Sequence, residues 1–380
     1  MKRTIPYGHQ DIDKKDIEAV ISTLESDFIT QGPRIDEFEQ AIANFVDAGY
    51  CTAVSSGTAA LHAACAVCGI SKGDEVIVPT LSFVASANCV VYCGGKPVLC
   101  DVYKDTLTIN VEDAERRINR KTRAIVAVDF AGHPADWSKL KRLCRKHRLT
   151  LIDDATHALG SRYHGKPVGS LADLSVFSFH PVKLITTGEG GVVATNNKNF
   201  LNKLIQFRNH GIERGQKIWQ KYGGWFYDIS TMGFNYRLTD MQASLGISQF
   251  KKIDSYIKKR RLIWQRYQKA LKGNQLVQLP IEKDNCFSAW HIFPIRLNLE
   301  KMKKSRRQVF DEMRNAGIEV QVHYIPIHFL SFYRKRFGYK TGMFPVAEDY
   351  YKRALTLPLF PTLSQSRQYY IVRKLQEIVQ

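Results

Sequence analysis

The chain has 380 residues, of which 44% are apolar and 24% are charged. That length suits two domains or one large domain with a smaller appendage, and the composition excludes wholesale disorder. No apolar run approaches the roughly 20 residues that a membrane helix needs, and the first residues lack the apolar core of a secretory signal. We therefore expect a cytoplasmic protein without membrane contact.

The eight cysteines lie mostly within apolar stretches, which is typical of reduced, buried thiols. Cys65 and Cys68 form a C-x-x-C pair, but the pair lies in a helical pattern and no second pair follows at zinc spacing. We interpret both residues as part of the core and expect no metal site.

The net charge of +19 is concentrated in the last third of the chain. Residues 1–250 carry a net charge of +3, whereas residues 251–380 carry +16. Such a surface favours anionic substrates, polyanions or anionic membranes, and it also serves solubility alone. Neither zinc-finger spacing nor an aromatic RNA-binding strand is present, so we expect no nucleic-acid partner.

Short β-branched runs alternate with helical patterns from about residue 50 to 195. The predicted strands are CTAVSS, DEVIVPT, KPVLCDV, RAIVAVDF, RLTLIDDA, LSVFSFH and GVVATN. This alternation predicts an α/β domain with a mostly parallel central sheet, in which ligands collect at the carboxyl ends of the strands.

The second half begins with one long periodic helix over residues 240–272, which we expect to connect two domains. Beyond it, HIFPIRL, KSRRQVFDEMRNAG and IEVQVHY predict a strand, a helix and a strand. We therefore expect a large domain over residues 1–250, including an N-terminal segment, and a small C-terminal α/β domain over residues 251–380.

The stretch SSGTAAL, residues 55–61, places a glycine turn between a strand and a helix. The free N–H groups of Gly57 and Thr58 would bind an anion at the helix N-terminus, with Ser56 and the Thr58 hydroxyl as further donors. Ordinary helix capping explains the same residues.

Two adjacent carboxylates, Asp153 and Asp154, close the apolar strand in LTLIDDATHALGS. Neighbours in a strand point to opposite faces, so the two should have different roles. A buried carboxylate needs a donor or a positive charge, and a protonated heteroaromatic nitrogen would supply one. His157 lies close enough in sequence to flank the same ligand. Capping of a following helix is the alternative.

Lys183 follows the buried strand in FSFHPVKLITTGEGG. Desolvation there disfavours the ammonium, and a neutral amine attacks carbonyls to form a Schiff base. The run TGEGG lacks the G-x-G-x-x-G pattern and the strand-to-helix context of a dinucleotide loop, so we expect its glycines to shape a tight hairpin.

These pieces form a set that pyridoxal 5'-phosphate (PLP) requires. The helix N-terminus suits its phosphate, Asp154 suits its pyridine nitrogen, Phe83 suits its ring face, and Lys183 suits its aldehyde.

The chain resembles the DegT/DnrJ/EryC1/StrS sugar aminotransferases, within fold-type I of the PLP enzymes. The similarity runs from IPYGHQDI and FITQGPRIDEFE to MGFNYRLTDMQASLG and VHYIPIH. FSFHPVK and TTGEGG are most similar to the branch that forms UDP-4-amino-4,6-dideoxy-N-acetyl-β-L-altrosamine for pseudaminic acid. A related branch, the sugar dehydratases, has His at the position of Lys183. The lysine in this chain therefore favours transamination.

The resemblance implies that Lys183 holds the cofactor as an aldimine and shuttles the proton, while Asp154 pairs with the pyridine nitrogen. It implies a homodimer with shared active sites, in which Asn235 reaches the phosphate of the neighbouring subunit. The other cofactor contacts that it implies are Gly57, Thr58, Phe83, His157 and Ser178. The implied substrate contacts are Tyr7, Asp27, Phe28, Ile29, Thr30, Ser56, Ser178, Arg214, His323 and Tyr324.

The implied reaction moves an amino group from L-glutamate, leaving 2-oxoglutarate, to a UDP-linked 4-keto-6-deoxy-HexNAc by ping-pong kinetics. Two alternatives stay open. The same chemistry would act on a dTDP- or GDP-linked sugar or at another keto position, and a degenerate site would leave a basic surface-binding module. The basic charge would attract a diphosphate substrate, with Arg214, Arg237 and the basic residues of the small domain as candidates.

Overall fold

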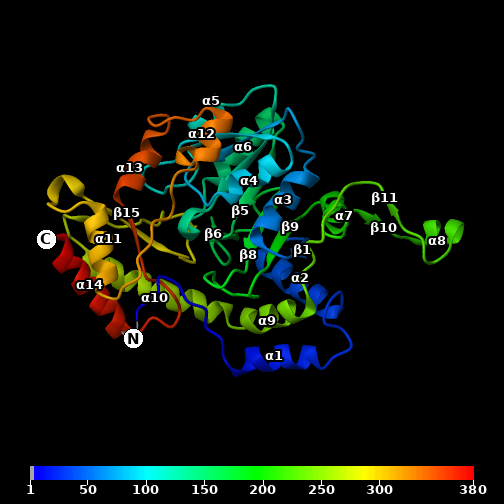
Figure 1. Cartoon of the computed structure of the whole chain (residues 1–380), viewed down its shortest axis with the longest axis horizontal. Helices are drawn as coiled ribbons and strands as arrows, with labels where there is room; N and C mark the ends of the chain where they lie inside the picture. The colour runs from blue at the N-terminus through cyan, green and yellow to red at the C-terminus, as the bar shows by residue number, and fades with distance from the viewer. Residues whose placement is uncertain (1–3) are drawn as a thin grey trace.

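The computed structural model describes residues 4–380, and its centre is a seven-stranded sheet in the order β1-β9-β8-β5-β4-β2-β3 (Figure 1). β9 runs antiparallel to both of its neighbours, and every other pair is parallel. The predicted mostly parallel α/β sheet is therefore confirmed. The strands are β1 (Tyr50–Val54), β2 (Glu75–Pro79), β3 (Lys96–Cys100), β4 (Thr122–Val128), β5 (Thr150–Asp154), β8 (Leu174–Ser178) and β9 (Gly191–Thr195).

Alternate residues of each strand enter two different hydrophobic cores, one on each face of the sheet. In β2, Val76 and Val78 join one core whereas Ile77 joins the other, as the two-residue period of a strand requires. Residues of α3 (Gly57–Val67) and α4 (Ala85–Tyr92) belong to the first core. Residues of α2 (Pro33–Val46), α6 (Trp137–His147) and α9 (Asp240–Phe250) belong to the second.

An arm projects from the body between α7 (Lys198–Phe207) and α9 (Figure 1). It consists of the antiparallel pair β10 (Ile212–Glu213) and β11 (Asp228–Ile229), with α8 (Gln216–Tyr222) at its tip. Most of its large apolar side chains are exposed, above all Trp225 at 84% and Met232 at 83%. Exposed apolar surface of this extent indicates an interaction surface.

The predicted single helix over residues 240–272 is two helices, so that prediction was wrong. α9 ends at Phe250 and α10 (Ile253–Leu271) begins after a turn at Lys251 and Lys252. The Lys252 ammonium is 2.6 Å from the fully buried Asp16 carboxylate of α1 (Lys14–Leu24). α9 packs on α1 and α2, whereas α10 packs on α14 (Gln365–Val379). Because the two helices pack against different parts of the protein, the chain turns between them, although the apolar pattern of the sequence continues through the turn.

The C-terminal part contains the antiparallel sheet β12 (Val277–Gln278), β14 (Phe293–Leu297) and β15 (Ala354–Leu357). The predicted strand in HIFPIRL and the predicted helix before residue 318 are confirmed by β14 and α11 (Arg306–Asn315). The predicted strand over residues 318–324 was wrong. Two of its residues bridge different partners, Ile318 to Ile5 and Gln321 to Thr356, so no continuous ladder forms.

The remaining α-helices are α5 (Val111–Arg116), α12 (Ser331–Phe337) and α13 (Pro345–Arg353), and the remaining strands β13 (Cys286–Phe287), β6 (Arg162–Tyr163) and β7 (Lys166–Pro167) form a small sheet. Within residues 4–380, the helices are too short or too polar to cross a membrane.

Candidate active site

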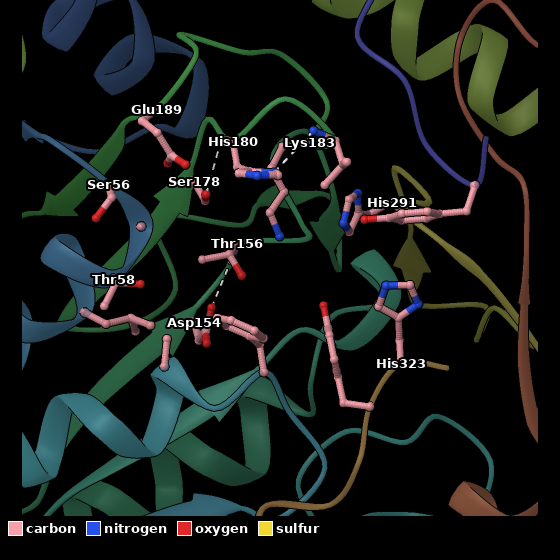
Figure 2. A pocket seen from close by; sticks show the side chains of 17 residues that line it. Ser56, Thr58, Asp154, Thr156, Ser178, His180, Lys183, Glu189, His291 and His323 are labelled. Atoms are coloured by element: carbon pink, nitrogen blue, oxygen red, sulfur yellow. Dashed lines mark hydrogen bonds between the residues drawn. The ribbon is translucent and has the colours of Figure 1, made fainter. Parts of the chain in front are cut away.

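A cavity of about 420 Å³ lies at the carboxyl ends of β1, β5 and β8, where the sheet topology predicts a ligand site. Figure 2 shows Ser56 and Thr58 on one side of it, His291 and His323 on the other, and Asp154 and Lys183 approaching from below and above. The predicted site residues that it brings together are Tyr7, Ser56, Gly57, Thr58, Phe83, Asp154, Ser178, Lys183, His323 and Tyr324.

The N-terminus of α3 forms one wall and leaves two backbone donors for a ligand. The Ser56 hydroxyl caps the helix by accepting the Ala59 N–H at 3.1 Å. Within residues 4–380, no hydrogen bond of the protein uses the Gly57 or Thr58 N–H groups. Capping and an anion site therefore coexist at this terminus, and a phosphate fits there.

Close backbone packing around this anion site requires glycine at two positions. A Cβ on Gly57 would lie 2.8 Å from the Cβ of Ser178, and one on Gly191 would lie 2.4 Å from the Ser56 carbonyl oxygen. Both distances are shorter than real carbon contacts allow. The glycine that opens β9 thus lets the Gly-rich stretch pack directly against the anion site.

Asp154 and Asp153 face opposite sides of the sheet, as their strand position predicts. Asp154 reaches the cavity, and its Oδ2 accepts the hydroxyl of Ser86 at 2.5 Å. Asp153 accepts the Ser175 hydroxyl at 3.2 Å on the other face. Burial, followed by the nearby carboxylate of Asp129, raises the pKa of Asp153 well above its usual range. Of the two, only Asp154 borders the cavity.

Lys183 extends from a loop over residues 179–190, with its N–H bonded to the His180 carbonyl at 2.8 Å. Burial lowers the pKa of Lys183 to about 8, against an opposing effect of Asp154 and a smaller contribution from Arg260. The amine is therefore partly neutral near neutral pH, as a nucleophile must be. β8 and β9 do pair as a hairpin, but this loop is too long for the tight turn that we predicted.

A cluster of neutral imidazoles and a phenol closes the far side of the cavity. Burial lowers the pKa values of His157 and His291 well below the usual range and that of His323 to about 4. The His157 ring is 4.4 Å from the His291 ring. His157 lies behind Tyr324 rather than on the cavity wall, and its Nε2 is 3.0 Å from the Tyr324 hydroxyl.

The predicted cofactor and substrate contacts leave out four polar residues of the cavity wall, which are Thr156, His180, Glu189 and His291. His180 and Glu189 lie in the same loop as Lys183, and Thr156 follows Asp154, so proximity in sequence was a usable signal for those three. His291 opens a run that predicts only a strand, and no sequence signal marks it.

Six of the predicted residues lie away from the cavity of their own chain. Asp27, Phe28, Ile29 and Thr30 are exposed between α1 and α2, and Arg214 lies on the arm beside Tyr227. Asn235 is exposed and bridges Asn209 at the base of the arm.

The DegT/DnrJ/EryC1/StrS aminotransferase family matches residues 10–376, and the chain belongs to this family. A UDP-4-amino-4,6-dideoxy-N-acetyl-beta-L-altrosamine transaminase of Campylobacter jejuni is 38% identical over 93% of this chain and 92% of the relative. GDP-perosamine synthase of Escherichia coli O157:H7 is 35% identical over 98% of both chains. The PMP form of the sugar aminotransferase Spr1654 of Streptococcus pneumoniae has a TM-score of 0.93 and 30% identity over 99% of both chains.

The enzyme is accordingly a PLP-dependent sugar aminotransferase, and the cavity fits that cofactor. Free N–H groups suit the phosphate, and the Asp154 carboxylate suits a protonated ring nitrogen. Phe83, 55% exposed, borders the space between these ends. The depressed pKa of Lys183 suits attack on the cofactor aldehyde.

Proposed function

We propose that this enzyme transfers the amino group of L-glutamate to C4 of a UDP-linked 4-keto-6-deoxy-HexNAc, UDP-2-acetamido-2,6-dideoxy-β-L-arabino-hex-4-ulose. The observation that carries the chemistry is the single cavity that joins the α3 N-terminus, Asp154 and Lys183. The choice of sugar is supported by 38% identity to a UDP-sugar transaminase over nearly the whole chain.

In this proposal Gly57, Thr58 and Ser178 hold the phosphate, and Phe83 stacks on the ring. Tyr7, His323 and Tyr324 contact the sugar from the opposite side, where their rings form one connected cluster. Ser56, the N-cap of α3 beside Gly57 and Thr58, is a further proposed substrate contact.

PLP supplies an electron sink that stabilises the carbanion formed at the Cα of the amino donor. Asp154 keeps a proton on the ring nitrogen, because a carboxylate stabilises a positive charge beside it. The Lys183 Nζ would remove the Cα proton of the amino donor as a general base and then, as a general acid, deliver it to a different carbon from the one that lost it. Burial prepares Lys183 for both roles, because a pKa of about 8 leaves both protonation states populated near neutral pH.

We further propose a homodimer in which a second copy completes each site. The residues that face solvent around the arm include Phe28 and Ile29 as well as Trp225 and Met232. Such apolar exposure supports burial against a second copy. Among the cavity-lining residues of the described range 4–380, Lys183 is the one lysine or arginine, and its amine is partly neutral near neutral pH. Arg214 of the second copy would therefore add the charge that a diphosphate needs.

The test is amino transfer from glutamate to a panel of UDP-, dTDP- and GDP-linked 4-keto sugars, measured as the mass change of each product. We expect the amine only from the UDP-linked 4-keto-6-deoxy-HexNAc. Amine formation from a different nucleotide sugar alone contradicts the proposed substrate but not the transaminase chemistry. Lys183→Ala serves as the inactive control.

A second candidate is a GDP-linked 4-keto sugar. It is favoured by the 35% identity to GDP-perosamine synthase, which covers 98% of both chains. The same panel separates the two candidates.

A further inference from the structure

Two buried serine hydroxyls lie behind Asp154 on the side away from the cavity centre. Ser86 in α4 donates its hydroxyl to Asp154 Oδ2 at 2.5 Å, and the Ser82 and Ser86 hydroxyl oxygens are 2.6 Å apart. All three side chains are at most 3% exposed. Solvent therefore does not replace either hydroxyl.

The acceptors around the two serines determine which hydroxyl donates to which oxygen. Ser86 has one hydroxyl proton and two acceptors, the Asp154 carboxylate at 2.5 Å and the Phe83 carbonyl at 3.1 Å. The carboxylate is nearer and charged, and hydrogen bonds to charged acceptors are the stronger ones. Ser82 must then donate to the Ser86 oxygen, so the chain of donation runs from Ser82 through Ser86 to Asp154.

The other carboxylate oxygen of Asp154 is held independently. Its Oδ1 accepts the Thr156 N–H at 3.3 Å. With Ser86 on Oδ2, both oxygens are fixed by separate elements, and the orientation of the carboxylate toward the cavity is set before any ligand arrives. Preorganisation of this kind is what a charge-stabilising group requires.

We propose that Ser86, supported by Ser82, is a positioning residue that aims the Asp154 carboxylate at the ring nitrogen of PLP. This inference rests on the proposed role of Asp154. Phe83 lies in the same turn, and its carbonyl accepts the Ser86 backbone N–H at 3.2 Å. Ser86 therefore contacts Asp154 through its hydroxyl and Phe83 through its backbone, so one residue fixes two cofactor contacts relative to each other.

The test compares the affinity of the full-length apoenzyme for PLP with its affinity for 1-deaza-PLP, in which carbon replaces the ring nitrogen. Equilibrium dialysis of each variant gives both dissociation constants. Ser86→Ala should weaken PLP binding about tenfold or more, the usual effect of losing a hydrogen bond to a charged group. Because the analogue has no nitrogen to contact, its affinity should stay nearly unchanged. Ser82→Ala should show the same selectivity with a smaller loss, and Ser86→Thr, which keeps the hydroxyl, should bind PLP nearly normally.

Val90→Ala is the matched control, since Val90 is fully buried on the same helix and should weaken both ligands alike if it weakens either. An equal loss of both ligands in Ser86→Ala, or no loss of PLP, overturns the inference. Asp154→Ala distinguishes a failure of the inference about Ser86 from a failure of the proposed role of Asp154. If it discriminates between the ligands and Ser86→Ala does not, only the inference fails. If neither discriminates, the proposed role of Asp154 fails as well. Should Ser86→Ala not fold, Ser82→Ala and Ser86→Thr decide the question by the same comparison.

Discussion

The hydroxyl of Tyr324 lies 3.0 Å from Nε2 of His157, across 167 positions of sequence. The Ala131 N–H donates to the other ring nitrogen, Nδ1, at 3.3 Å. Burial lowers the pKa of His157, so the ring is neutral and its single proton sits on Nε2. His157 therefore donates to Tyr324, and the phenol directs its own proton elsewhere, toward the cavity that it lines.

This arrangement predicts that Tyr324 donates a hydrogen bond to the bound substrate and that His157 acts through it. Tyr324→Phe should lower kcat/KM about tenfold, as expected for one lost hydrogen bond. His157→Leu should be costly in the parent enzyme but nearly neutral in the Tyr324→Phe background. Steady-state kinetics of the four proteins measure this coupling. Strictly additive losses would show that the two residues act separately.

Lys183 should control both covalent attachment of the cofactor and turnover. Lys183→Ala should retain PLP without a bond that borohydride fixes, and should lose transamination by several orders of magnitude. Mass spectrometry after borohydride treatment checks the first outcome and single-turnover assays check the second. Comparable turnover in the variant would contradict the assignment.

The pH dependence of Lys183 follows from its depressed pKa. Since the neutral amine is the reactive form, the rate of covalent attachment to apoenzyme should rise through about pH 8 and level off above it. Between about 8 and the ordinary value of 10.5, the unfolded chain binds more protons at this residue than the folded one. This residue therefore makes apoenzyme more stable as the pH rises across that window. Urea unfolding of apoenzyme and Lys183→Met should differ in that slope, and equal slopes would contradict the shift.

Substitution by Asn should lower activity strongly at Asp154 but hardly at all at Asp153. Asp154→Asn should lower kcat at least a hundredfold, because the charge beside the ring nitrogen is lost. Asp153→Asn should keep activity within about threefold, because Asp153 faces the other side of the sheet.

Stability gives an independent check on Asp153. Its raised pKa means that it stabilises the fold at low pH and loses that contribution as the pH rises through the folded value. Asn does not ionise, so the Asp153→Asn variant does not lose stability in this way as the pH rises. The melting temperature of the variant at neutral pH should therefore equal or exceed that of the parent. A marked fall in both activity and melting temperature would contradict the raised pKa of Asp153.

The shared site of the proposed homodimer is testable by complementation. Lys183→Ala and Asn235→Ala should each lower activity at least tenfold when expressed alone, because each removes a group from every site. In a mixed dimer, one site receives both intact residues, one from each copy. Co-expression with two purification tags should therefore restore activity in the doubly tagged fraction. No recovery there would exclude sharing of these residues. Trp225→Ala in the parent tests whether the arm sustains the dimer, by light scattering.

Strand patterns predicted the positions of the main site residues. Asp153 and Asp154 had to face opposite sides because strand residues alternate, and Lys183 had to follow a buried strand at the ligand-binding edge. The resemblance to sugar aminotransferases supplied the roles of Phe83 and Ser178, and the structure places both at the cavity.

Local sequence patterns did not predict contacts between segments that are distant in sequence. Ser86 and Asp154 are 68 positions apart, and the turn at Lys251 and Lys252 interrupts a sequence that is periodic throughout. Periodicity encodes which face of an element is apolar, but it does not encode which other element that face meets.

The sequence by itself therefore determined the family, the α/β sheet and the set of groups that we propose to hold PLP, because these follow from local patterns and continuous motifs. Only the tertiary structure decided that His157 lies behind Tyr324, that His291 reaches the cavity, and that Asp27 to Thr30, Arg214 and Asn235 lie outside the cavity of their own chain. Those relations depend on how separate helices, loops and strands pack together. That packing is determined by the volume and burial of side chains throughout the molecule.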